Sequence, residues 1–318
     1  MQPQSLEEEK KTPKITLSKK YSTPHQSFIA LAVNIIPLIG TIIAIFLGVK
    51  NGIKGWEIAL LLTFYFLTLT GITVGYHRLF AHRTFETSKV TKILLVILGS
   101  MACQGPLLYW ASNHRRHHQY SDHPEDPHSP HCSKTKIFNS LQGFWHAHIY
   151  WVATHEITNI LVFGKDLLKD SITIKINRLY PCWVLIGLAI PTLIGGLIEG
   201  TIEGLVLGFL WGGCVRLFLS SHFTWSINSI THLYGSRPFN TKEWSRNNIW
   251  LALPTLGEGW HNNHHAFPNS AKLGLQFWQI DIGYWIVRGL EIAGLVWNVK
   301  FPSAEAIAAK KGIEVPPL

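Results

Sequence analysis

Four long apolar runs constrain this chain more than any other feature of its sequence. They cover residues 28–49, 56–76, 180–198 and 202–223. A helix needs about 20 apolar residues to cross a bilayer, and each run has about that length. The whole chain is 47% hydrophobic and 15% charged, whereas soluble domains carry about 25% charged residues. The sequence therefore predicts an all-α integral membrane protein with four transmembrane helices.

The segments between the runs predict how these helices are arranged. Residues 50–55 join the first two runs and residues 199–201 join the last two, so we expect two hairpins. Most of the 28 Lys and Arg lie in the N-terminal, central and C-terminal sections. Such residues concentrate on the cytosolic side of a membrane. We therefore expect a multi-pass protein of the bacterial inner membrane or endoplasmic reticulum, with both termini in the cytosol.

The same reasoning divides the chain into a membrane domain and two tails. A polar tail is expected at residues 1–26, one membrane domain at 27–300, and a second tail at 301–318. Residues 77–179 and 224–300 would form a cytosolic helical cap. The net charge of +9 fits anionic lipid headgroups, and we expect no nucleic acid partner.

Small residues indicate where the helices pack closely. Gly71 and Gly75 lie one turn apart in the second run, and glycines recur at 200, 204, 208 and 212 around the fourth. Small residues at this spacing allow close helix contact in membranes. Arg216 continues the glycine series near the end of its run, where we expect its side chain to extend to the interface.

Three histidine motifs lie beside these runs and carry the chemistry. They are H-R-L-F-A-H (His77, His82), H-R-R-H-H (His114, His117, His118) and H-N-N-H-H (His261, His264, His265). Positions i, i+3 and i+4 share one face of a helix, so the three histidines of each longer motif are expected to point at one spot. His232 is the ninth member. One zinc needs four ligands, so nine imidazoles fit two metals, each with four or five.

The spacing of His77 and His82 carries a further constraint. Five residues apart on an ideal α-helix, the two side chains diverge by about 140°. They can face one metal only if the helix loosens there, although two adjacent metals would also explain the offset.

Residues 90–110 are apolar but interrupted at 103–106. If they crossed the membrane, the first two motifs would lie on opposite sides, so we expect an interfacial helix there. Residues 275–297 are interrupted by charges and are interpreted as amphipathic.

Ligand type alone leaves the metal open. Imidazole suits Zn, Cu, Fe or Ni, and the absence of thiolate ligands argues against a structural zinc site. From these observations a metal transporter or storage protein remains an alternative. It would place its ligands inside the spans, near the middle of the membrane.

The motifs closely resemble those of membrane fatty acyl desaturases. The likeness is strongest to the Δ9, stearoyl-CoA type and covers about residues 28–300. It extends beyond the histidine boxes to three longer stretches: G-Y-H-R-L-F-A-H-R-T-F, N-S-I-T-H-L-Y-G-S-R-P-F and G-E-G-W-H-N-N-H-H-A-F-P. His148 also matches a family position. We expect most of the remaining histidines, apart from these nine and His148, to be solvated or hydrogen-bonded.

The resemblance implies a non-haem di-iron centre that uses O2 to place a cis double bond in a saturated acyl chain. It implies iron ligation by all nine histidines, with Asn228, one turn before His232, binding through a water. The expected substrates are acyl-CoA or acyl-lipid. No H-P-G-G haem motif is present, so a separate cytochrome-type or ferredoxin-type electron donor is expected. A hydroxylase or alkane monooxygenase with a similar centre is the alternative within the enzyme class.

Further residues are assigned supporting roles. Asp126 and Glu258 are candidate carboxylates that orient imidazoles. Gln104, Tyr109 and Trp110 precede the second box and are candidates for the wall of an acyl tunnel. Animal members of the family tend to carry an Arg-Asp pair where this chain has Ser112 and Asn113. That departure leaves acyl-carrier-protein substrates open as well.

Overall fold

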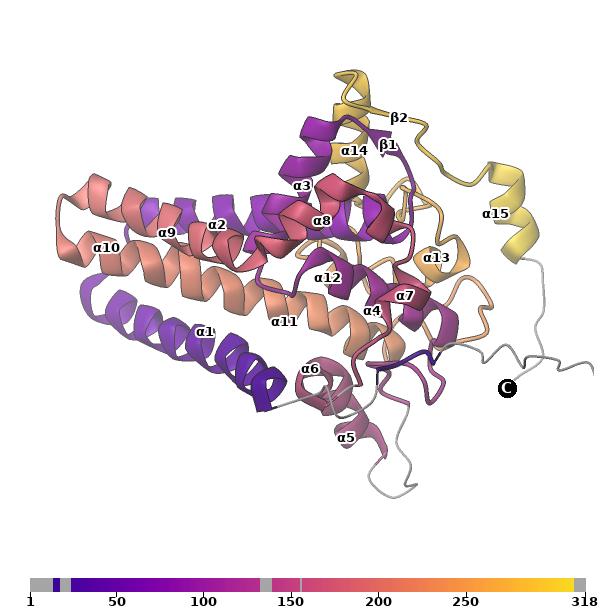
Figure 1. The fold of residues 1–318 in the computed structure, drawn as a ribbon, viewed down its shortest axis with the longest axis horizontal. Coiled ribbons are helices and arrows are strands. Elements are labelled where there is room, and N and C mark those ends of the chain that lie inside the picture. The colour runs from indigo at the N-terminus through magenta and orange to yellow at the C-terminus, as the bar shows by residue number, and fades with distance from the viewer. Residues whose placement is uncertain (1–13, 18–23, 132–138, 155, 312–318) are drawn as a thin grey trace, which may run out of the picture.

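The computed structural model describes residues 14–17, 24–131, 139–154 and 156–311 (Figure 1). Its first half contains α1 (Pro24–Asn51), α2 (Gly55–Thr70), the π-helix η2 (Gly71–Ala81), β1 (Glu86–Thr87), α3 (Lys89–Met101), α4 (Leu107–Tyr120), α5 (Asn139–Trp145), the π-helix η3 (His146–Tyr150) and α6 (Trp151–Thr154). β1 pairs with β2 (Val296–Trp297) as two antiparallel strands of two residues each. The other regular elements of the described residues are helical.

The second half continues the helical architecture. It contains α7 (Ile160–Phe163), η4 (Leu167–Lys169), α8 (Ser171–Arg178), α9 (Tyr180–Glu199), α10 (Ile202–Gly208), the π-helix η5 (Phe209–Val215), α11 (Arg216–Ser229), η6 (Ile230–His232), α12 (Ile249–Ala252), α13 (His261–Ala266), α14 (Ile282–Ile292), β2 (Val296–Trp297) and α15 (Ala304–Lys311). The predicted helical class is therefore confirmed.

Among the described residues, four continuous helices are long and apolar enough to cross a membrane, as predicted. They cover Ser27–Asn51, Gly55–Ala81, Tyr180–Glu199 and Ile202–His232. The second and fourth run on into the histidine motifs and include His77 and His232. α3 has 13 residues and α14 has 11, which is too short for a span. Placement of α3 in the interface, the hairpin and cap arrangement, the domain division and the cytosolic orientation stay predictions.

The two short connections between the candidate spans lie together. Lys54 forms an ion pair with Glu199 at 2.9 Å, and the indole N–H of Trp56 donates to the same carboxylate at 2.8 Å. The α9–α10 connection lies at the opposite end of the molecule from α13 and α15 (Figure 1). The histidine motifs therefore lie at one end of the helical bundle and these connections at the other.

Glycines determine how closely the third and fourth spans pack. A Cβ on Gly195 of α9 would overlap the backbone of Gly204, and a Cβ on Gly208 would overlap the carbonyl of Pro191. The predicted packing role of the glycine series is thus confirmed for α9 against α10. Gly200 has φ +67 and ends α9 in the left-handed conformation, which glycine adopts without steric cost.

Arg216 differs from its prediction. Its side chain is fully buried and does not extend to an interface. The guanidinium donates to the carbonyl oxygens of Gly212 at 3.0 Å, Met101 at 2.6 Å and Gly187 at 3.0 Å. A buried charge requires hydrogen-bond partners, and these three carbonyls supply them. Arg216 therefore connects the fourth span to α9 and to the end of α3.

The structure describes residues 14–17 of the predicted N-terminal tail. These residues pair with residues 156–159 through an isolated antiparallel bridge between Thr16 and Thr158. Leu17 N–H donates to Ile157 at 2.9 Å, and Asn159 N–H donates to Ile15 at 2.9 Å. Residues 1–13 of the predicted tail lie outside the described part of the chain. Within the predicted C-terminal tail, the helix α15 is present.

The contact between η2 and α3 provides a test of the packing. A Cβ on Gly71 would overlap the backbone nitrogen of Gly99, whereas the Cβ site of Gly55 is open. We expect Gly71→Ala to destabilise the protein by about 1–3 kcal/mol, the usual cost of overpacking. Gly55→Ala, in the same candidate span, should leave stability unchanged. Thermal unfolding in detergent checks both, and equal melting temperatures would contradict the close contact.

Candidate metal centre

The loosened helix that the spacing of His77 and His82 required is present as η2. The His82 N–H donates to the His77 carbonyl at 3.0 Å, which is the i to i+5 hydrogen bond of a π-helix. Residues five apart then follow each other after about one turn, so both side chains point to the same side. Their ring centroids are 4.8 Å apart.

The first histidine group draws on three helical segments. It contains His77, His82, His114, His118 and His264, whose ring nitrogens lie within 4.8 Å of one another. The Nε2 atoms of His82 and His114 are 2.7 Å apart, and those of His118 and His264 are 2.8 Å apart. His77 Nε2 is 3.1 Å from His264 Nε2. η2, α4 and α13 thus bring five imidazoles to one point.

The second group lies beside the first. It contains His117, His232, His261 and His265, again within 4.8 Å. The Nε2 atoms of His232 and His261 are 3.1 Å apart. The Nε2 atoms of His117 and His265 are buried without a hydrogen-bond partner in the described part of the chain. A buried polar atom without a partner costs free energy, which a bound cation would remove.

The grouping corrects one expectation from spacing. His114, His117 and His118 do not all point at one spot, because His117 belongs to the second group. In α13, His264 joins the first group and leaves His261 and His265 in the second. Each of the two three-histidine boxes therefore gives its i, i+4 pair to one group and its remaining histidine to the other.

The spacing of the ring nitrogens fits a metal ion. Two imidazole nitrogens about 2.1 Å from one ion lie about 3 Å apart when their bonds meet near 90°. The Nε2 pairs in both groups are 2.7–3.1 Å apart. The groups also lie where the second and fourth candidate spans end. The transporter alternative predicted ligands near the middle of the spans, and the geometry does not match it.

Both carboxylates predicted to orient imidazoles contact the groups. His117 Nδ1 donates to buried Asp126 at 2.9 Å. His77 Nδ1 lies 2.7 Å from Glu258, which also accepts from Arg78 at 2.6 Å. A carboxylate on Nδ1 fixes the tautomer and leaves Nε2 free for a metal. Their placement fits the predicted role.

Sequence reasoning missed two further carboxylates with the same geometry. Asp122 accepts from His232 Nδ1 at 2.9 Å, and Glu243 lies 3.6 Å from His265 Nδ1. Asp122 is 110 positions from His232, so only the fold brings the two together. The one available signal for Asp122 was its place four residues after His118, in the same S-D-H-P-E-D stretch as Asp126.

The protonation states suit metal binding. Burial and then the neighbouring histidines lower the pKa of six imidazoles well below the usual value: His82, His114, His118, His261, His264 and His265. Burial acts to raise the pKa of Glu258, but His77 and Arg78 outweigh it and lower the pKa to about 2. Neutral imidazoles beside ionised carboxylates are the forms that a metal site requires.

The two arginines of the second box hold the site together. Arg115 donates to the carbonyls of Phe80 at 2.6 Å and Ala81 at 2.9 Å, and forms two hydrogen bonds with Asp166 at 2.6 and 3.1 Å. It thereby connects α4 to the end of η2. Arg116 donates to the carbonyl of Glu125 at 2.7 Å, beside Asp126. Sequence analysis assigned no role to either arginine.

The predicted tunnel residues share a cavity with the first group. Gln104, Tyr109 and Trp110 line it together with His114 and Asn228. A second cavity shares Trp110, His114 and Asn228 and continues along Leu69, Ile72 and Ile227 towards the candidate spans. Asn228 thus borders both cavities next to the histidines.

In the part of the chain that the structure describes, the remaining histidines lie outside the two groups. His148 Nε2 is 3.1 Å from His222 Nδ1, and His148 Nδ1 is 3.0 Å from the Ser229 hydroxyl. Its ring therefore pairs with a neighbour in the fourth span. His131 Nε2 donates to the His232 carbonyl at 3.0 Å, so it supports the second group from outside.

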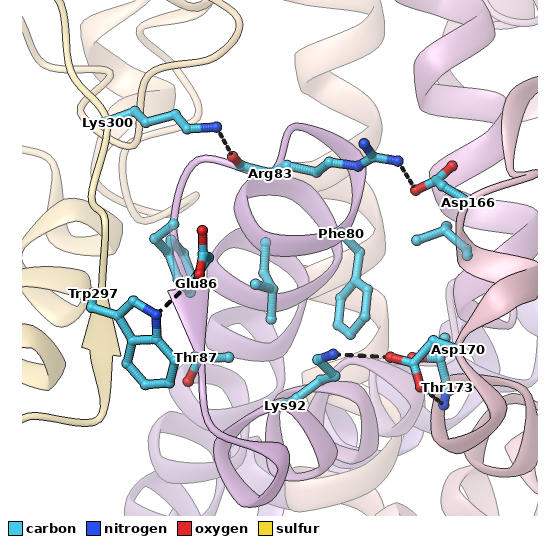
Figure 2. A pocket seen from close by; sticks show the side chains of 13 residues that line it. Phe80, Arg83, Glu86, Thr87, Lys92, Asp166, Asp170, Thr173, Trp297 and Lys300 are labelled. Carbon is cyan, nitrogen blue, oxygen red and sulfur yellow. Dashed lines mark hydrogen bonds and ion pairs between the residues drawn. The ribbon is translucent and has the colours of Figure 1, made fainter.

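A large surface pocket is separate from the metal centre (Figure 2). Its wall contains Arg83, Lys92, Asp166, Asp170 and Lys300, and none of the nine histidines. Arg83 pairs with Asp166, and Lys92 pairs with Asp170 at 2.9 Å. With Glu86, the wall carries three carboxylates and three cations, so its formal charge sums to zero.

Comparison with known proteins identifies the family. Residues 54–298 match the model of the fatty acid desaturase family. The chain is 48% identical to the hex-5-enoyl-[acyl-carrier protein] acetylenase of Moorena producens, over 93% of each chain. It is 38% identical to the sn-1 stearoyl-lipid 9-desaturase of Synechocystis sp. over 76% of this chain and 70% of the relative.

A third relative acts on another type of acyl carrier. The acyl-CoA C20 Delta5-desaturase of Anemone leveillei is 37% identical over 73% of this chain and 70% of the relative. The family match covers most of the chain and includes all nine histidines of the two groups. This chain is therefore an oxidoreductase of the fatty acid desaturase family.

Proposed function

We propose that this protein uses O2 and a di-iron centre to introduce a cis double bond, at Δ9, into a saturated acyl chain. The observation that carries the proposal is the division of nine histidines into groups of five and four. Each group offers enough imidazoles for one iron, and the groups adjoin. Two irons and O2 would supply an oxidant strong enough for an unactivated C–H bond, which acid–base side chains cannot attack.

The chain's own residues position the reaction. His77, His82, His114, His118 and His264 would hold one iron, and His117, His232, His261 and His265 the other, with Asn228 contributing through a water. Four carboxylates lie near the Nδ1 atoms of the imidazoles and would hold the rings in place: Asp122, Asp126, Glu243 and Glu258. The cavity along Gln104, Tyr109 and Trp110 would hold the acyl chain against the first group and exclude water.

The relatives support desaturation but differ in carrier. Their names specify an acyl-lipid, an acyl-CoA and an acyl-carrier protein. We propose acyl-CoA or acyl-lipid as the substrate carrier for this chain. A second candidate activity is conversion of an enoyl chain on acyl-carrier protein to an alkyne. The 48% identity to the acetylenase over 93% of the chain favours it.

Product analysis tests these activities directly. We expect expression of this chain in desaturase-deficient cells, with an electron donor, to produce a new cis-monounsaturated fatty acid. Gas chromatography with mass spectrometry locates the bond. A triple bond would support the second candidate, and a hydroxylated acid would support the hydroxylase alternative. Only saturated acids, with donor and iron present, would contradict the proposed function.

Removal of one ligand tests the metal centre. We expect His117→Ala to abolish activity and reduce bound iron, because His117 Nε2 faces the second group without another partner. His148→Ala is the matched control, since His148 is a buried histidine outside both groups. Iron is measured by elemental analysis of the purified protein. Full iron content and activity in His117→Ala would disprove its assignment as a ligand.

Two of the carboxylates beside the histidines provide a second test of the metal centre. Asp122→Asn and Asp126→Asn keep the shape but remove the charge beside His232 and His117. Partners of metal ligands typically contribute about 10–100-fold to metal affinity or activity, and we expect losses of that size. The exposed Glu305→Gln in α15 serves as the control. Iron affinity is measured by chelator competition, and unchanged affinity would show that these carboxylates do not support the site.

A further inference from the structure

A surface groove lies at the end of α13, next in sequence to two members of the histidine groups. It is lined by Ala266, Phe267, Pro268, Asn269, Ser270, Lys300, Phe301 and Pro302. Ala266 follows His265, a member of the second group, and the Phe267 N–H donates to the carbonyl of His264, a member of the first, at 3.1 Å. The wall of the groove is thus one or two residues from a candidate ligand of each metal.

The groove is apolar inside and cationic at its edge. Phe301 is 56% exposed, and Phe267 is partly exposed beside it. Lys310 of α15 donates to the Ala266 carbonyl and lies 4.9 Å from the Phe267 ring. Lys300, which lines the groove, is exposed. Lys311 is also exposed and lies 6.0 Å from the ring of Phe239, which contacts Phe267. Figure 2 shows Lys300 donating to the carbonyl of Arg83, at 3.0 Å. In the described part of the chain none of the three lysines has a carboxylate partner.

The position of the groove argues against the acyl chain and a lipid surface as its occupant. It shares no residue with the two cavities beside the histidines, which contain the candidate tunnel residues. α13 and α15 lie at the end of the molecule opposite the α9–α10 connection, beyond the candidate spans (Figure 1). A protein partner can reach this face, and unneutralised lysines favour an acidic one.

We propose that this groove, with Lys300, Lys310 and Lys311 at its edge, is the docking surface for an acidic one-electron carrier protein. This rests on the proposed function, since desaturation consumes electrons. The acyl segment –CH2–CH2–, O2, two electrons and two protons give –CH=CH– and two waters. The carrier is oxidised and supplies the electrons singly. Weak complexes of redox proteins bury little surface, so a small groove steered by charge suffices.

Binding without turnover tests the surface separately from desaturase activity. The iron-loaded full chain in detergent is titrated with an acidic plant-type [2Fe–2S] ferredoxin and with the soluble domain of an acidic b-type cytochrome. We expect at least one to bind, and its affinity to fall at least tenfold between 50 and 300 mM NaCl. Lys300→Glu/Lys311→Glu should also weaken binding at least tenfold. Lys175→Glu, an exposed lysine of α8, is the matched control and should bind within twofold of wild type.

Further measurements separate docking from structural damage. Phe301→Ser removes the apolar wall without touching a lysine, and we expect it to weaken binding as well. Iron content and activity with a small diffusible reductant should be unchanged in all variants. The proposal is overturned if neither carrier binds, if the lysine and control variants bind equally, or if the lysine variants lose iron. It is also overturned if binding to anionic vesicles depends on Lys300 and Lys311 while binding to the carrier proteins does not.

Discussion

The metal centre depends on a change of helical pitch at the end of the second candidate span. In an α-helix His77 and His82 would diverge by about 140°, whereas the π-helix η2 brings their rings to 4.8 Å. π-helices have poorer packing of their own backbone and usually occur in short pieces at functional sites. Here the 11 residues of η2 pack against α3 and α4. Gly71 allows the backbone of α3 to approach, and Arg115 hydrogen-bonds the last carbonyls of η2.

Charge explains why so many polar groups are buried around the histidines. Two divalent ions would bring four positive charges into the protein, where an unpaired charge is costly. Asp122, Asp126, Glu243 and Glu258 supply four negative charges on the Nδ1 side of the imidazoles. Buried Arg78 adds one positive charge and pairs with Asp281 at 2.9 Å. The surroundings thus balance two divalent cations without help from solvent.

Local patterns predicted the spans and the histidine set because both depend on short-range periodicity. Apolar runs marked the start of each span to within one residue, although the second and fourth helices continue beyond the predicted ends to Ala81 and His232. The boxes marked eight of the nine histidines that the fold brings together. Contacts between distant segments had no such signal. Asp122 meets His232 across 110 positions. Arg216 was wrongly expected at an interface, because its three carbonyl partners come from separate segments. Residues 14–17 pair with a loop that sequence periodicity does not mark.

The histidines of α4 and α13 show how one short helix can contribute side chains to two groups. Consecutive residues on an α-helix are 100° apart, whereas residues four apart nearly coincide in direction. α4 therefore gives His114 and His118 to the first group and the intervening His117 to the second. α13 makes the reverse assignment, with His261 and His265 in the second group and His264 in the first. Each helix axis must then lie between the groups. Any shift of α4 or α13 would therefore move members of both histidine groups together.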